Sequence, residues 1–167
     1  GISGLIRAYR AEGQAFLRRL NGGFVILLWD LEEDLFILAR DPLGVEPLYY
    51  SWESGRLAFG SSPRGVGRYA DTPAPLNPRA LAQYLMFNYN PGEESFFLSV
   101  RKLRPGHAIV LKDRSMRTTR YWSPEFEAPP LSGERAIREE LLARIKEAVR
   151  VRLAGPETAA GAFLSGG

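Results

Sequence analysis

A charged pair on a tight loop is the first group of residues with a chemistry of its own. Arg40 and Asp41 precede Pro42, Leu43 and Gly44, a combination typical of a turn. A guanidinium beside a carboxylate can form a bidentate ion pair, and such a pair could serve a catalytic centre. The alternative is a buried pair that shapes the loop, and we favour this structural role.

The other reactive side chains are few. His107 is the single histidine and follows Pro105 and Gly106. No partner cluster stands at metal-ligand spacing from it, so we expect a structural or surface role. The aromatic residues Tyr49, Tyr50 and Trp122 are expected in the core instead of on a ligand platform. The sequence contains no cysteine, which excludes disulfides, thiolate metal sites and thiol catalysis within these 167 residues.

The last residues have a pattern that suits phosphate binding. Ser165, Gly166 and Gly167 follow the apolar residues 160–164, which predict a short strand. Small residues after a strand let backbone N–H groups approach an anion closely. A flexible end would show the same three residues, but the preceding amphipathic helix and strand favour the phosphate-binding interpretation.

The elements that must position these residues are mostly antiparallel strands. Residues 3–12 and 14–20 place apolar side chains at helical spacing, with Gly13 between them. Residues 24–29 are apolar throughout, as in a strand covered on both faces. The remaining predicted strands are residues 35–39, 48–52, 57–61, 108–112 and 116–122, joined mainly as hairpins. A helix is expected to start near Pro78 and to end near Phe87.

Composition then changes toward the end of the chain. Residues 124–133 contain Pro124, Pro129 and Pro130 and few aliphatic residues, which indicates a linker between domains. Residues 134–153 carry apolar residues on one helical face, with Ser132 as a candidate cap and Gly155 after the end. The sequence therefore predicts one domain over residues 1–123 and the start of another at residue 134.

Overall composition limits the class of protein. Hydrophobic residues make up 45% of the chain, so a packed core is expected. The net charge of +3 is small and the basic residues are scattered among acidic ones, which argues against nucleic-acid binding. No apolar run is long enough to span a bilayer and no signal peptide is recognisable, so the expected compartment is the cytoplasm.

Five stretches in order resemble the asparagine synthetase family of glutamine-dependent (class II) amidotransferases. They are FLRRLNGGF at residues 16–24, ARDPLGVEPLYY at 39–50, LAFGS at 57–61, VRKLRPGH at 100–107 and GAFLSGG at 161–167. Two positions depart from the family pattern, because Glu46 stands where a basic residue is more frequent and Ser62 where an acidic one is. The resemblance covers essentially the whole chain.

The resemblance implies an α+β fold. Residues 1–123 would be the C-terminal half of a glutaminase domain, an N-terminal-nucleophile hydrolase with an αββα sandwich. Residues 134–167 would begin an α/β ATP pyrophosphatase domain. By resemblance, the Leu164 backbone would lie beside the adenine nucleotide, while Ser165, Gly166 and Gly167 would bind phosphate. The complete enzyme would use ATP and Mg²⁺, glutamine and aspartate, and would form an acyl-adenylate.

The resemblance supplies no glutaminase catalytic residue to this sequence. The family's nucleophile is an N-terminal cysteine whose own amino group acts as the base, and here the first residue is Gly1. The acidic residue that binds the substrate amino group would fall near Gly1. Both active sites would therefore be incomplete, and the chain alone is expected to be inactive.

Three alternatives remain at this point. The chain could belong to a glutamine-hydrolysing asparagine synthetase, to a β-lactam synthetase-like relative without glutaminase activity, or to a non-catalytic binding module. No membrane or nucleic-acid partner is expected, and the sequence leaves open whether the protein forms a homodimer. Without the first half of the sandwich, residues 24–39 would expose an apolar face, so we expect poor solubility or oligomers.

Overall fold

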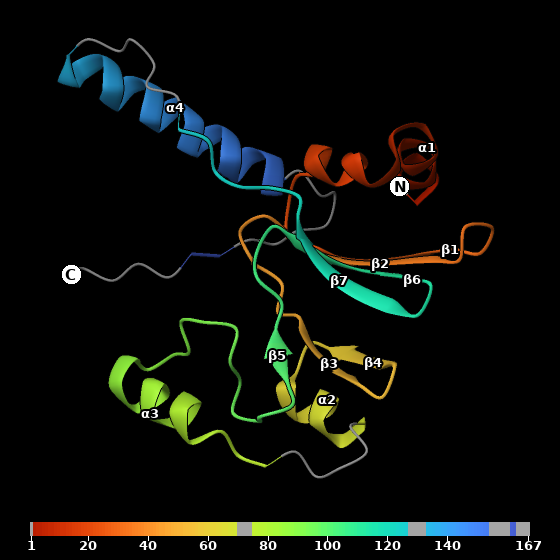
Figure 1. The fold of residues 1–167 in the computed structure, drawn as a ribbon. Coiled ribbons are helices and arrows are strands. Elements are labelled where there is room, and N and C mark those ends of the chain that lie inside the picture. The colour runs from red at the N-terminus through yellow and green to blue at the C-terminus, as the bar shows by residue number, and fades with distance from the viewer. Residues whose placement is uncertain (1, 70–74, 127–132, 154–160, 163–167) are drawn as a thin grey trace. The chain divides into compact units, whose positions relative to one another are not determined.

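The computed structural model describes residues 2–69, 75–126, 133–153 and 161–162 (Figure 1). The chain divides into two compact units, Gly1–Pro124 and Glu125–Gly167. The first unit contains every strand of the described part of the chain, and the second contains one long helix.

The first unit opens with two consecutive helical segments. Helix α1 spans Ile2–Glu12, and the 3-10 helix η1 spans Gly13–Arg19. Gly13 has φ of 57°, a left-handed conformation that suits a glycine at a helix end. Phe16 and Leu17 of η1 are buried. Both predicted helical segments are therefore confirmed, the second as a 3-10 helix.

A four-stranded antiparallel sheet follows, in the order β1-β2-β6-β7. Its strands are β1 (Val25–Asp30), β2 (Leu35–Arg40), β6 (His107–Lys112) and β7 (Ser115–Arg120). Two hairpins build it, and β2 pairs with β6 so that Leu38 lies opposite Ile109. The two hairpins predicted from the sequence are confirmed.

A second antiparallel sheet has the order β4-β3-β5 (Figure 1). Strands β3 (Tyr49–Glu53) and β4 (Arg56–Gly60) form the predicted hairpin, and β5 (Arg101–Lys102) pairs with β3. The sequence did not predict β5, because two residues give no periodicity. It also did not predict helix α2 (Pro63–Tyr69), where two glycines lower the helix propensity. Burial of Val66 stabilises that helix against the sheet.

Alternation along β2 separates two apolar layers. Ile37 and Ala39 pack with Phe16 and Leu17 of η1, on the helix-covered face. Leu38 points the other way and packs with Leu48 and other residues between the two sheets. With α1 and η1 outside one sheet and α2 beside the other, the unit is α+β and compatible with the predicted αββα sandwich. Tyr50 is buried and Trp122 packs against the helix-side cluster, so both are core aromatics as expected.

Strand β1 differs from its prediction. A strand covered on both faces was expected, but Val25, Leu27 and Trp29 are 40%, 49% and 60% exposed. In this sheet β1 is an edge strand with β2 as its neighbour. The apolar face expected to be open in residues 24–39 is therefore confirmed along β1.

Helix α3 spans Pro78–Phe87, as predicted. Its first turn is capped by Asn77, whose Oδ1 accepts hydrogen bonds from Arg79 N at 3.1 Å and Ala80 N at 3.3 Å. The helix ends at Asn88 with φ of 62°, a conformation that asparagine tolerates.

The second unit contains helix α4 (Glu134–Leu153), whose bounds match the predicted helix. None of its residues is buried, and pairs such as Arg144 with Glu140 bridge successive turns. The predicted strand at residues 160–164 extends into residues outside the described part, and Ser132 lies there too. Within the residues that the structure describes, no helix is long and apolar enough to cross a membrane.

Candidate functional site

The loop after β2 uses both of its charged side chains to bind backbone groups. The Arg40 guanidinium donates to the carbonyl oxygens of Glu46 (Nε, 2.6 Å), Leu103 (Nη1, 2.7 Å) and Gly44 (Nη2, 2.8 Å). Arg40 is 6% exposed. Its side chain therefore ties the loop to the residue that follows β5.

Asp41 binds the same loop from within. Its Oδ1 accepts from the N–H groups of Leu43 (3.1 Å) and Val45 (2.9 Å), and its Oδ2 from that of Glu46 (3.0 Å). Burial alone would raise the pKa of Asp41, but the hydrogen bonds from these backbone amides outweigh it and the pKa lies below its ordinary value. The carboxylate is therefore ionised, and both of its oxygens accept hydrogen bonds from the loop. Arg40 and Asp41 are buried and shape the loop, as predicted, but each side chain binds backbone groups instead of pairing with the other.

Close packing fixes the loop further. Gly44 has φ of 68°, and a Cβ built on it would lie 2.8 Å from Pro105 Cγ. Gly106 has φ of 67°, and its Cβ would lie 2.7 Å from the carbonyl oxygen of Trp122. The Tyr121 hydroxyl donates to the Arg40 carbonyl oxygen at 2.5 Å. The two glycines and the tyrosine allow residues 40–46 to pack closely against the turn that precedes β6 and the residues that follow β7.

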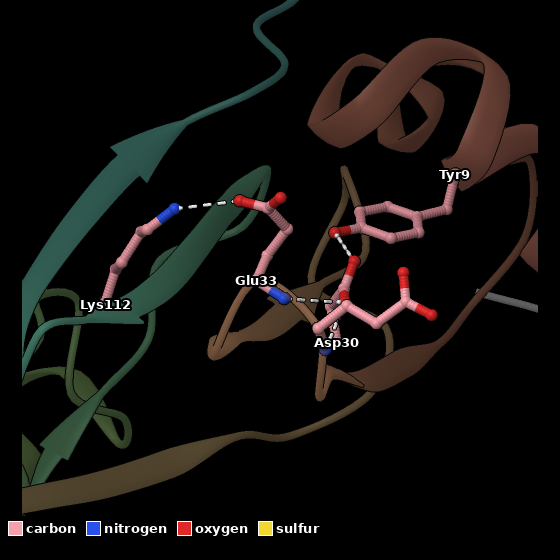
Figure 2. Close-up of polar contacts among 5 residues, drawn as sticks. Tyr9, Asp30, Glu33 and Lys112 are labelled. Atoms are coloured by element: carbon pink, nitrogen blue, oxygen red, sulfur yellow. Dashed lines mark hydrogen bonds and ion pairs between the residues drawn. The ribbon is translucent and has the colours of Figure 1, made fainter.

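A second polar group joins α1 to the first hairpin (Figure 2). The Tyr9 hydroxyl donates to Asp30 Oδ2 at 2.7 Å, and Asp30 Oδ1 accepts from the N–H groups of Glu32 and Glu33. Burial, followed by this contact with Asp30, raises the pKa of Tyr9 to about 12. The hydrogen bond from Tyr9 and the backbone bonds lower the pKa of Asp30. Lys112 Nζ donates to Glu33 Oε2 at 3.1 Å, and Figure 2 marks this contact.

The sequence analysis did not identify this group. Tyr9 and Asp30 are separated by 21 residues, so no local spacing relates them. The available signal was Asp30 itself, since an aspartate directly after a strand often accepts hydrogen bonds from the next turn.

An open apolar hollow of about 360 Å³ lies at the hairpin ends of both sheets. Its lining includes Trp29, Phe36, Trp52 and Phe59, with Arg114 at the turn between β6 and β7. The centroids of the Phe36 and Phe59 rings, both in the lining, are 6.1 Å apart. The lining also includes the charged residues Asp34, Lys112 and Asp113. Its aromatic walls suit an apolar side chain or segment.

The remaining sequence-predicted residues are placed as follows. His107 Nδ1 lies 2.8 Å from the Pro105 carbonyl oxygen, which agrees with a structural role. Among the residues that the structure describes, no group of three His, Cys, Asp or Glu side chains could hold a metal ion. The predicted nucleotide-binding residues Leu164, Ser165, Gly166 and Gly167 lie outside the described residues.

Comparison with known proteins finds a matching family and several similar sequences. Residues 3–122 match the family described as the glutamine amidotransferase domain. The chain is 31% identical over 170 residues to a Mycobacterium bovis protein provisionally named an asparagine synthetase (glutamine-hydrolysing), and the match covers 98% of the chain. It is 27% identical over 164 residues to asparagine synthetase (glutamine-hydrolysing) 1 of Bacillus subtilis, again over 98% of the chain. A Gibberella zeae protein named amidase chry2 is 29% identical over 168 residues.

These relatives are much longer than the chain. It spans 26% of the Mycobacterium and Bacillus proteins and 24% of the Gibberella protein.

Proposed function

The chain belongs to the glutamine amidotransferase domain family, and we propose that it forms the C-terminal part of the glutaminase domain of an asparagine synthetase-like enzyme. The observation that supports this proposal most directly is the family match over residues 3–122, which coincides with the first compact unit, Gly1–Pro124. Alignment of 98% of the chain with glutamine-hydrolysing asparagine synthetases supports the same assignment. The fold would be that of an N-terminal-nucleophile hydrolase.

In this proposal the 167 residues position the active site and do not supply its nucleophile. Glutamine hydrolysis in the family depends on an N-terminal cysteine, and the sequence contains no cysteine. The nucleophile would come from a segment outside these residues that completes the sandwich. The open apolar face of β1, with Leu27 and Trp29, is a surface that such a segment would cover.

We extend the proposal to the second unit as the start of an ATP pyrophosphatase domain. Ser165, Gly166 and Gly167 would bind phosphate through their N–H groups, and Leu164 would lie beside the adenine nucleotide. ATP with Mg²⁺ would activate a carboxylate, aspartate in an asparagine synthetase, and ammonia from glutamine would then form the amide. The support is the resemblance at residues 161–167 together with the names of the relatives.

Activity of the native polypeptide tests both parts of this proposal. Glutamate release from glutamine and ATP–pyrophosphate exchange should both occur with the polypeptide purified from its source. The 167-residue chain should give neither above a heat-denatured control. Exchange without glutamate release would replace the proposal by a β-lactam synthetase-like function. Absence of both activities in the native polypeptide would leave a non-catalytic module.

A further inference from the structure

A second hollow in the first unit differs from the aromatic one in charge. It has a volume of about 460 Å³, and four of its seven lining residues are basic: Arg40, Lys102, Arg104 and His107. No acidic residue lines it in the described part of the chain. Pro91, Gly92 and Pro105 complete its wall and carry no charge to offset these side chains. The hollow is therefore electropositive.

The charges of its arginines are already balanced. Arg104 forms an ion pair with Glu93. Burial lowers the pKa of Arg40, and the negative charge of the adjacent Asp41 offsets part of that shift. Each guanidinium thus has a carboxylate near it.

In the described part of the chain, Lys102 has no carboxylate paired with it. Its Nζ donates to the carbonyl oxygen of Asn90 at 2.9 Å, and among the ion pairs recorded for the described residues none includes Lys102. Burial, and then the charge of Arg40, lower the pKa of Lys102. A partly buried ammonium bound to a neutral carbonyl leaves one positive charge without compensation inside the hollow.

We propose that this hollow binds a small oxyanion of the phosphate class, with Lys102 as the principal cation and Arg104 beside it. An ammonium has three rotatable donors and an arginine has a fixed fork of N–H groups, and together they suit an anion with several oxygens. The anion would supply the negative charge that the lining lacks. The site uses neither glutamine nor a cysteine, so it goes beyond the proposed glutaminase role.

Calorimetric titration of the 167-residue chain with inorganic phosphate, at constant ionic strength set with chloride, tests the proposal. One saturable site is expected, and Lys102→Gln should weaken phosphate binding by about tenfold or more, because it removes the unpaired charge. The matched control is Lys112→Gln, since Lys112 lies on β6, pairs with Glu33 and does not line the hollow. The control should bind phosphate as the original chain does.

Several results would overturn the proposal. They are an absence of saturable binding at millimolar phosphate, equal weakening by both substitutions, and acetate binding as tightly as phosphate, which would indicate a carboxylate site for an acidic protein segment. If Lys102→Gln does not fold, NMR of the original chain decides. Saturating amide shifts confined to residues around Gly92 and Lys102 would support the site, and shifts spread over all basic residues would contradict it. No outcome bears on glutaminase activity.

Discussion

Replacement of Asp41 by Asn removes one negative charge from a side chain that is 0% exposed. The amide oxygen of the new side chain can occupy the place of Oδ1 and keep the hydrogen bonds from Leu43 and Val45. Its NH₂ group then faces the N–H of Glu46, which donates to Oδ2 in the original chain. Two donors oppose each other there, and the Glu46 amide has no acceptor.

The magnitude follows from these three contacts. A hydrogen bond to a charged acceptor contributes about 1.5–3 kcal/mol against about 1 kcal/mol for a neutral one, so the two retained bonds weaken. The Glu46 amide without an acceptor costs about 1–3 kcal/mol. Removal of a buried charge offsets part of this loss. We expect Asp41→Asn to lower the free energy of unfolding by about 2–4 kcal/mol.

Urea unfolding at pH 7, followed by tryptophan fluorescence, measures this loss. The control is Asp34→Asn, because Asp34 is exposed and has φ of 43°, a conformation that asparagine also adopts readily. The control should change the free energy of unfolding by less than about 0.5 kcal/mol. Equal effects of the two substitutions would refute the reasoning about the loop.

Acid should remove the stability that the ionised Asp41 carboxylate contributes. Its folded-state pKa lies below the ordinary value of 3.8, so its contribution to stability is complete above that pH and is lost as the pH falls through the folded pKa. The difference in stability between the original chain and Asp41→Asn should therefore narrow below about pH 4. A constant difference down to pH 2 would contradict an ionised, hydrogen-bonded carboxylate.

Three further substitutions test other features of the first unit. Tyr9→Phe should remove the absorbance titration near pH 12 and lower the free energy of unfolding by about 1 kcal/mol, because the hydrogen bond to Asp30 is lost. Since the folded pKa of Tyr9 is raised, the stability that this hydrogen bond contributes is full below pH 10 and is lost as the pH rises toward 12. Gly44→Ala should cost about 1–2 kcal/mol more in thermal unfolding than Gly55→Ala, since both have positive φ but only Gly44 has a neighbour within 4 Å of the added Cβ. Leu27→Lys should shift the chain toward monomers in sedimentation velocity, and an original chain that is monomeric at all concentrations would contradict an adhesive β1.

The longer helices and strands were predictable because their apolar periodicity is strong. Helix α4 has the predicted bounds, and the hairpins of residues 25–40, 49–60 and 107–120 follow from apolar runs and turn residues. Helix α2 and strand β5 were not predictable, since Gly65 and Gly67 weaken the helical signal and β5 has two residues. Their positions depend on tertiary packing, as the burial of Val66 shows.

Polar contacts were likewise predictable where they are local in sequence and not where they join distant residues. The structural role of Arg40 and Asp41 follows from a local Pro-Gly loop and was predicted. The contact of Tyr9 with Asp30 and the position of Lys102 beside Arg40 join residues far apart in sequence, so no spacing could reveal them. Strand β1 was expected to be covered on both faces because its composition is that of a central strand. In the described residues β1 is instead an edge strand, and its alternate residues Val25, Leu27 and Trp29 form an exposed face.

Terminal sequencing with an intact mass, on the native polypeptide from its source, tests the central claim most directly. Membership of a glutaminase domain whose nucleophile lies outside these residues predicts a longer polypeptide. It should begin with cysteine, include the 167 residues internally and continue beyond Gly167. A mature polypeptide that begins at Gly1 and ends at Gly167 would contradict the claim, because it would contain no thiol for glutamine hydrolysis.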